Sequence, residues 1–187
     1  MRMRTGYSWL IVAGLLCACS PSSPPAPADA PSPAASAQPP GAVSSAPVAA
    51  DVAALNTRFD PARDPAADLA VAQAEAHRTG KRIVLDVGGE WCSWCHLLDA
   101  FIEGDAEVRT RVDASYVWMK VNYSEDNENA AFLSQFPAIK GYPHLFVLDA
   151  DGKLLHSQFT GELEADKGQP KGYNRERFLA FVQAWAP

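Results

Sequence analysis

Two cysteines separated by two residues, Cys92 and Cys95, constrain this chain more than any other feature. The apolar run Ile83-Val87 precedes them, and apolar residues at the spacing of one helix face follow them, so the thiols are predicted at a strand-to-helix corner. The free N–H groups and positive dipole end of a helix N-terminus stabilise a thiolate at Cys92. Cys95, one turn further, is predicted to be the more buried, resolving thiol. This arrangement favours electron exchange.

Other interpretations of the same cysteines are possible. Cys92, Cys95 and His96 also satisfy the Cys-x-x-Cys-His pattern of c-type haem attachment, for which Met119 is the one methionine after the N-terminal segment that could serve as an axial ligand. Because Met119 lies in a predicted strand, haem ranks second. A structural disulfide rarely joins neighbours three apart at a helix start. A zinc site would need two further ligands, and the histidines show no suitable spacing.

The chain as a whole has the size of one domain, with 187 residues, four cysteines and a formal charge of −6. Its acidity argues against a nucleic-acid partner. The longest apolar run lies near the N-terminus and is about half of the ~20 residues that a transmembrane helix needs. It is predicted to be a targeting signal.

Residues 1–18 have the parts of a signal peptide, with basic residues in front of an apolar stretch. Leu16-Cys17-Ala18-Cys19 resembles the lipobox of bacterial lipoproteins, with Cys19 at the lipidated position and Cys17 as a departure. By the same resemblance, Ser20 favours the outer membrane. Cleavage at a later alanine, which would release an unanchored exported protein, is the alternative. We expect the membrane to be reached only through this N-terminal lipid.

Residues 19–55 are predicted to be the lipid-anchor site and a disordered Pro/Ala/Ser linker, because this composition buries too little apolar surface to fold. Residues 56–187 are predicted to form the folded domain. Helices are expected at 64–79, after the cysteines, at 108–112, at 130–136 and after Asn174; strands are expected at 83–87, 116–122, 145–148 and 153–159, the last two as a hairpin. This order predicts an α/β fold with a mixed central sheet and helices on both faces.

The residues from about 64 to 187 resemble the thioredoxin-fold family. Trp91-Cys92-Ser93-Trp94-Cys95 is similar to its active-site motif, and Gly141-Tyr142-Pro143 is similar to its cis-proline loop. Asp86 and Lys120 fall where the family keeps a buried acid and a neighbouring lysine. The resemblance implies a three-layer fold. Ser93-Trp94 replaces glycine and proline, and His144 stands where threonine is commoner, which bears on redox potential and partner choice.

The resemblance also implies roles for individual residues. Asp86 interrupts an apolar strand, so burial should raise its proton affinity, and the family implies that it accepts a proton from Cys95. Lys120 would tune Asp86, although a solvated lysine is the alternative. Pro143 is expected to be cis, with Tyr142 offering backbone groups to the substrate. Trp91 is expected to form part of a docking rim, while Trp94 and His96 stay unassigned.

These features together predict an exported, periplasm-facing thiol-disulfide oxidoreductase, lipid-anchored at Cys19 to the outer membrane. The Cys92–Cys95 pair would need no bound cofactor. Its partners would be substrate proteins with disulfides and a membrane-bound dithiol electron donor, and the chain would act as a monomer. The reductase direction is favoured because an Asp86 and Lys120 pair resembles reductants. A c-type haem protein and a non-catalytic binding module are the alternatives.

Overall fold

The structure is a computed structural model that describes residues 45–187. Its helices and strands are α1 (Ser45–Ala54), α2 (Pro65–Thr79), β1 (Arg82–Gly88), α3 (Ser93–Gly104), α4 (Ala106–Ser115), β2 (Tyr116–Asn122), α5 (Ala130–Leu133), β3 (His144–Leu148), β4 (Leu154–Phe159), a 3-10 helix (Thr160–Leu163) and α6 (Arg175–Ala184). The predicted signal sequence, the predicted lipid site at Cys19 and most of the predicted linker lie outside the described residues. No helix within 45–187 is long and apolar enough to cross a membrane.

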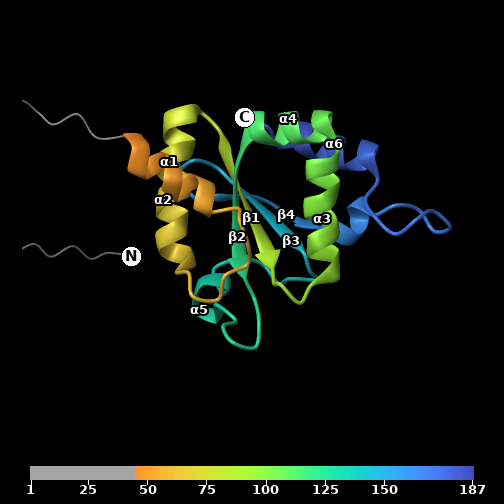
Figure 1. The fold of residues 1–187 in the computed structure, drawn as a ribbon, viewed down its shortest axis with the longest axis horizontal. Helices are drawn as coiled ribbons and strands as arrows, with labels where there is room; N and C mark the ends of the chain where they lie inside the picture. The colour runs from red at the N-terminus through yellow and green to blue at the C-terminus, as the bar shows by residue number, and fades with distance from the viewer. Residues whose placement is uncertain (1–44) are drawn as a thin grey trace, which may run out of the picture. The chain divides into compact units, whose positions relative to one another are not determined.

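A four-stranded mixed sheet forms the centre of the domain, in the order β2-β1-β3-β4. Strand β1 pairs in parallel with β2 and antiparallel with β3, and β3 forms the predicted hairpin with β4. Figure 1 shows α1 and α2 on one side of this sheet and α3 on the other, with α4 and α6 on the side of α3. The predicted three-layer α/β architecture is therefore confirmed.

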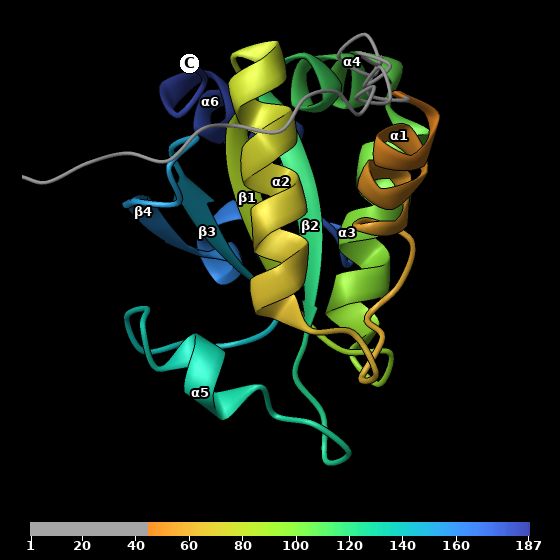
Figure 2. The same cartoon turned by 90° about the vertical axis from the view of Figure 1, so that its left-hand side faces the viewer.

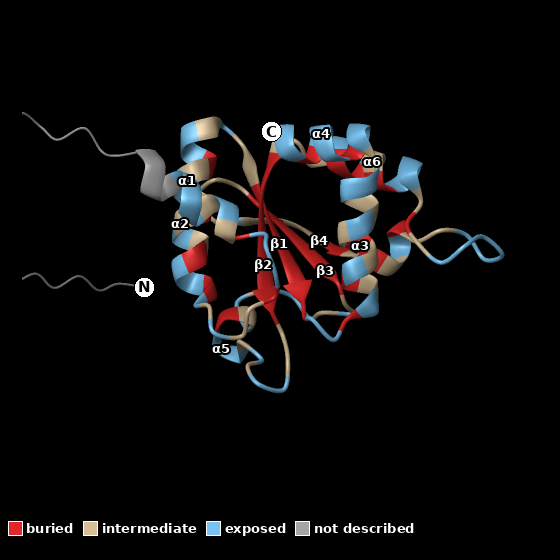
Figure 3. Ribbon diagram, in the orientation of Figure 1, coloured by how far each residue is buried: buried red, intermediate tan, exposed pale blue. Residues whose placement is uncertain are grey.

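Side chains point alternately to the two faces of the sheet along each strand, and this divides the core into two apolar layers. The α2 layer contains Leu85 and Met119, and the α3 layer contains Val84 and Val147. Figure 2 shows α2 in front of the sheet, running along β1 and β2, and Figure 3 shows that the strands are buried almost throughout. Burial on both faces explains why β1 and β3 are mostly apolar along their whole length, with Asp86 and His144 as buried exceptions.

The helix boundaries follow local sequence signals. The Asp64 side chain accepts a hydrogen bond from the Ala66 N–H at the start of α2, and Gly80, with φ of 73°, ends that helix in the left-handed conformation. The Asn174 side chain caps α6 in the same way, as predicted. Helix α5 is shorter than the expected 130–136, because the chain turns at Ser134, three residues before Pro137.

Helix α1 lies within residues 19–55, the segment that the sequence analysis assigned to a disordered linker. Leu55, directly after α1, is fully buried in the α2 layer, and its carbonyl oxygen accepts a hydrogen bond from the Lys120 N–H on β2. This bond pairs one group of an edge strand that would otherwise face solvent. Ordered structure thus begins before Asn56, because alanine favours helix and Leu55 supplies a buried anchor.

Candidate redox site at the start of helix α3

The two cysteines lie at the corner between β1 and α3, and they form a disulfide with a Cα–Cα distance of 5.2 Å. Cys92 is the N-cap of α3, and its sulfur accepts a hydrogen bond of 3.1 Å from the Cys95 N–H. The predicted position of Cys92 at a helix N-terminus is therefore confirmed. Free N–H groups at this end favour negative charge on the sulfur that caps it.

The two sulfurs differ in their access to solvent. Cys95 is completely buried, whereas Cys92 keeps 4% of its surface exposed, with Phe59 and Tyr142 packed around the pair. A Cβ atom at Gly88 would lie 2.4 Å from the Cys95 sulfur, so only glycine lets β1 approach the disulfide this closely. Both cysteines are thus buried, Cys92 is the one of the two with any exposure, and Cys95 faces the sheet.

Asp86 is a fully buried carboxyl on the face of the sheet that carries α3. Its Oδ2 accepts a hydrogen bond of 3.2 Å from the Trp118 indole N–H, and its Oδ1 has no hydrogen-bond partner among the described residues. Burial raises the pKa of Asp86 to about 6, with a smaller contribution from the charge of Asp99, while Lys120 and Trp118 act in the opposite direction. The expected desolvation of this acid is present.

Lys120 lies opposite Asp86 in the β1–β2 register, and its side chain is only 3% exposed, so it is not a solvated lysine. Its Nζ is 3.8 Å from Asp86 Oδ2, but it donates hydrogen bonds of 2.6 and 2.7 Å to the two oxygens of Asp99. It also lies 4.2 Å from the centre of the Phe59 ring. Lys120 therefore interacts mainly with Asp99, through hydrogen bonds, and more weakly with Asp86.

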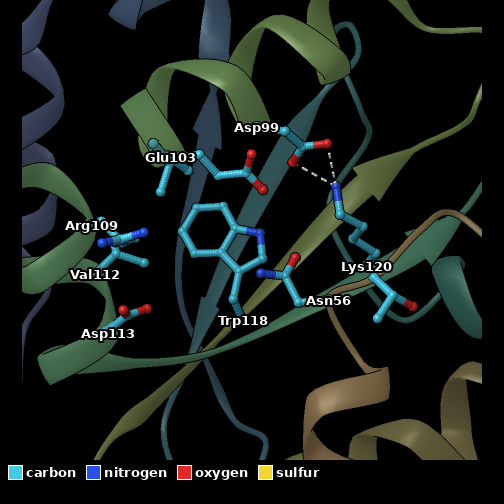
Figure 4. Close-up of a pocket in the computed structure, with 10 residues that line it drawn as sticks. Asn56, Asp99, Glu103, Arg109, Val112, Asp113, Trp118 and Lys120 are labelled. Carbon is cyan, nitrogen blue, oxygen red and sulfur yellow. Dashed lines mark hydrogen bonds and ion pairs between the residues drawn. The ribbon is translucent and has the colours of Figure 1, made fainter. Parts of the chain in front are cut away.

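Asp99 was not predicted from the sequence to belong to the site. It follows Cys95 by four residues on α3, a spacing that places both side chains on one helix face, and that spacing was the available signal. Figure 4 shows the Lys120–Asp99 pair at the wall of a cavity of about 350 Å³, beside the Trp118 ring. Lys120 and Trp118, which neighbour Asp86, therefore also line this cavity.

The peptide bond between Tyr142 and Pro143 is cis, as expected. The Thr160 hydroxyl donates a hydrogen bond to the Pro143 carbonyl oxygen. The Tyr142 ring stacks on Tyr123 at 4.8 Å between centroids and packs against the cysteines. The structure thus brings the proline loop and the disulfide together.

The remaining aromatic residues of the motif have different surroundings. Trp91 is 57% exposed, its indole N–H donates to the Tyr123 carbonyl oxygen at 2.8 Å, and its ring contacts Tyr142 edge-on at 5.5 Å. Trp94 instead packs inward against Tyr173, with the Lys171 ammonium 4.7 Å from its ring centre. Trp91 therefore has the exposure that a docking rim requires, and Trp94 supports the packing of α3.

Two histidines near the site have contrasting environments. His96 is exposed, and its Nε2 lies 2.8 Å from the Glu90 carbonyl oxygen. His144, next to Pro143, is buried, with Nε2 2.9 Å from the Ser157 hydroxyl and Nδ1 unpaired among the described residues. Burial lowers the pKa of His144 to about 4, so this side chain is neutral at pH 7.

The described residues give the zinc and haem interpretations no support. They contain no group of three or more side chains that could hold a metal ion. Met119 lies in the α2 layer, whereas the cysteines belong to a cluster with Phe59. It is therefore not placed to act as a haem ligand together with His96.

Comparison with known proteins agrees with this geometry. The thioredoxin-like domain family matches residues 69–170. Proteins named thiol:disulfide interchange protein DsbD are 30% identical over 87 residues in Colwellia psychrerythraea and 31% identical over 96 residues in Pseudoalteromonas atlantica, covering 46% and 49% of this chain. The aligned parts are only 14% and 16% of those relatives. A disulphide isomerase from Xylella fastidiosa has the same fold, with a TM-score of 0.57 at 22% identity over 70% of this chain and 97% of its own.

The fold, the family match and the Cys92–Cys95 pair together define the class of the protein as a thioredoxin-like domain with a Cys-x-x-Cys disulfide. The chain belongs to the thioredoxin-like domain family. The thioredoxin-like fold that the sequence predicted is confirmed.

Proposed function

We propose that this protein is a disulfide reductase of the cell envelope that transfers two electrons from the Cys92–Cys95 dithiol to disulfides in other proteins. The observation that carries this proposal is the asymmetry of the pair. Cys92 caps a helix and keeps 4% of its surface exposed, whereas Cys95 is completely buried on the face of the sheet that holds Asp86. One sulfur is placed to attack and the other to resolve.

In the first step, the Cys92 thiolate attacks one sulfur of the substrate disulfide. A bond forms between Cys92 and that sulfur, the substrate S–S bond breaks, and the second substrate sulfur leaves as a thiolate. The N-terminal end of α3 stabilises the attacking thiolate. Because Cys92 retains some exposure and Cys95 has none, attack by Cys92 is the geometrically possible order.

In the second step, Cys95 loses its proton and attacks the Cys92 sulfur, which releases the substrate as a dithiol and forms the Cys92–Cys95 disulfide. Asp86 serves as the proton acceptor, directly or through water. With a pKa of about 6, it is mostly ionised at pH 7 and still basic enough to take a proton. Its unpaired Oδ1 supplies the free lone pairs.

Lys120 and Asp99 act on Asp86 as positioning residues. The closer Asp99 oxygens hold the Lys120 ammonium, so it only partly neutralises Asp86 at 3.8 Å. A lysine bound fully to Asp86 would lower the pKa of that carboxyl and weaken it as a base. The shared lysine thus keeps Asp86 suited to accept a proton near neutral pH.

The cis-proline loop and Trp91 are the substrate-contacting groups in this proposal. Tyr142 lies against the cysteines and would pair its backbone with an extended substrate segment, as an added strand does. Trp91 offers an exposed aromatic surface beside it. Aromatic residues with this exposure frequently carry binding energy at interfaces.

The cellular setting follows from the N-terminal sequence, which lies outside the described residues. We propose export to the periplasm, cleavage after residue 18 and lipidation of Cys19, with the outer membrane as destination. A membrane-bound dithiol protein would return the Cys92–Cys95 disulfide to its reduced form. The relatives named for thiol:disulfide interchange support such an exchange partner.

The reduction potential of the Cys92–Cys95 pair tests the direction. A reductase should have a potential near that of thioredoxin, about −270 mV, whereas a value near −120 mV, as in the oxidant DsbA, would contradict the proposal. The potential is measured by equilibrating the purified protein with glutathione buffers and determining the oxidised fraction. Insulin reduction by wild type and by Cys92→Ser then tests whether the activity depends on this thiol.

A further inference from the structure

Three aromatic rings form a continuous surface next to the disulfide. Tyr142 packs against the cysteines, Tyr123 stacks on Tyr142, and Trp91 contacts Tyr142 edge-on and Tyr123 through a hydrogen bond. Trp91 is the exposed large hydrophobic side chain of the described domain. We name these residues the aromatic surface. An aromatic surface of this kind tolerates many apolar partners, so it provides affinity with little selectivity.

An acidic loop continues this surface away from the disulfide. Glu125, Asp126 and Glu128 are exposed, and together with Trp91 and Tyr123 they line a groove of about 670 Å³. Glu128 also acts on Tyr142, since its negative charge contributes to the raised pKa of that phenol, which burial dominates. Within residues 49–187, no ion pair occupies any of these three carboxylates. The groove is therefore aromatic on one side and negative on the other.

The loop that carries these acids is fixed by its own polar side chains. The Asn122 amide donates to the Asn127 carbonyl oxygen at 2.7 Å, and the Asn129 amide donates back to the Asn122 carbonyl oxygen at 2.8 Å. The Asn127 amide donates to the carbonyl oxygen of Pro61, which ties the loop to the segment before α2. A loop held in this way presents its charges without a large ordering cost on binding.

We propose that this groove selects substrate segments that carry lysine or arginine close to the disulfide cysteine. The inference rests on the proposed reductase function and names the class of substrate. The substrate's aliphatic lysine or arginine stem would pack on Trp91, while its charged end would meet Glu125, Asp126 and Glu128. Complementary charge at a rim also accelerates the encounter of two proteins.

The sequence and the far side of the site support an external, basic occupant. Residues 20–44 of this chain contain no lysine or arginine, so the chain's own N-terminal segment lacks the charge that the groove would bind. On the other side of the cysteines, Lys171 lies over the Trp94 ring and 3.4 Å from the Ser93 hydroxyl. The three carboxylates thus lie on the Trp91 side and the Lys171 ammonium lies beside Trp94, which would orient a substrate with a basic segment.

Three disulfide-bonded peptides with the same core and lysine, glutamine or glutamate beside the cysteine test the inference. The pre-reduced protein should reduce the lysine peptide about tenfold faster than the glutamine peptide at low ionic strength, and the glutamate peptide slowest. In 0.5 M NaCl the differences should largely disappear, because salt screens exposed charges. Equal rates for the three peptides at low salt would overturn the inference while leaving the reductase function intact.

A triple variant locates the effect on the loop. Glu125→Gln/Asp126→Asn/Glu128→Gln should lower the rate ratio of lysine to glutamine peptide from about ten to near one. An unchanged ratio would overturn the inference. Circular dichroism should show wild-type folding, since all three side chains are exposed.

A second triple variant controls for net charge. Asp51→Asn/Asp113→Asn/Glu176→Gln removes the same charge from exposed positions on α1, α4 and α6, away from the cysteines, and should keep the ratio near ten. A ratio that falls equally in this control would contradict a local groove.

A binding measurement separates this inference from the proposed function. Versions of the lysine and glutamate peptides with serine in place of cysteine are titrated against the oxidised protein, with intrinsic tryptophan fluorescence as the signal. Binding of the lysine peptide in preference to the glutamate peptide is expected. If the protein reduces none of the disulfide peptides but binds the lysine peptide selectively, the proposed reductase function is wrong and the proposed selectivity of the groove is supported. If the lysine and glutamate peptides bind equally, the proposed selectivity of the groove is wrong.

Discussion

The two faces of the central sheet are formed by the same strands but have different roles. The face toward α2 is a largely apolar layer that includes Met119 and Phe146, with the neutral His144 as its buried polar side chain. The face toward α3 is interrupted by Asp86 and Lys120, which are buried at a cost in free energy. The comparison teaches that one layer supplies stability, which allows the other to hold the charged groups that the thiols need.

Removal of the attacking thiol should have the largest effect on the α3 side. Cys92→Ser is expected to lower disulfide reduction by about 10³-fold or more, because serine cannot replace the thiolate as a nucleophile in this exchange. Insulin reduction measured by turbidity is the readout. A matched change on the other face, Met119→Leu, should leave this activity near the wild-type value. Retained activity in Cys92→Ser would contradict the assigned mechanism.

Truncation in the α2 layer should affect stability instead. Phe146→Ala is expected to lower the free energy of unfolding by about 3–5 kcal/mol, because it removes a fully buried ring and leaves a cavity. Urea unfolding followed by circular dichroism gives this value. Per folded molecule, insulin reduction should change little, and a large loss of activity in the folded fraction would mean that the two layers are not separate in function.

Replacement of the buried acid should separate the two chemical steps. Asp86→Asn is expected to slow resolution by Cys95 about 10²-fold and to leave attack by Cys92 much less affected, because only the second step needs the proton acceptor. Rapid mixing of the reduced protein with a model disulfide, followed by acid quenching and mass spectrometry, measures the lifetime of the mixed disulfide. Equal slowing of both steps would remove the proposed role.

The same variant should change how stability depends on pH. The pKa of Asp86 is raised to about 6, so the folded state binds this proton more tightly than the unfolded chain does. The stabilisation is full below about pH 4 and is lost as the pH rises through 6, a change of roughly 3 kcal/mol by linkage. Asp86→Asn should therefore be more stable than wild type at pH 7. Urea unfolding of both proteins from pH 4 to 8 checks the sign.

The smallest expected effect concerns Asp99. In Asp99→Asn, loss of one negative charge and release of Lys120 toward Asp86 should lower the pKa of Asp86. The pH profile of the resolving step should then shift to lower pH by about one unit or less. Asp99→Glu, which keeps the charge, should restore the wild-type profile. An unchanged pH profile in Asp99→Asn would mean that Asp99 holds the Lys120 side chain in position without affecting the pKa of Asp86.

Local patterns predicted most of the secondary structure and the central residues of the site. The strand at 116–122, the α2 and α6 caps and the thiol corner follow from periodicity and capping chemistry, which act over a few residues. Asp86, Lys120 and Pro143 were placed by resemblance at spacings that the fold preserves. Helix α1 was not anticipated, since its Ala-rich composition continues that of the linker and only Leu55 reveals its anchoring.

The chain's own residues determined that a reactive sulfur would cap a helix, that an acid would interrupt a buried strand and that a proline loop would follow. Tertiary structure decided which groups those residues meet. Phe59 and Gly88 enclose the cysteines. Lys120 donates its hydrogen bonds to Asp99 instead of to Asp86, and the aromatic surface lies beside the disulfide. The physical reason is the sequence separation over which each effect acts. Helix capping and the periodicity of apolar residues depend on near neighbours in the sequence. Desolvation and charge interactions depend on side chains brought together from distant segments.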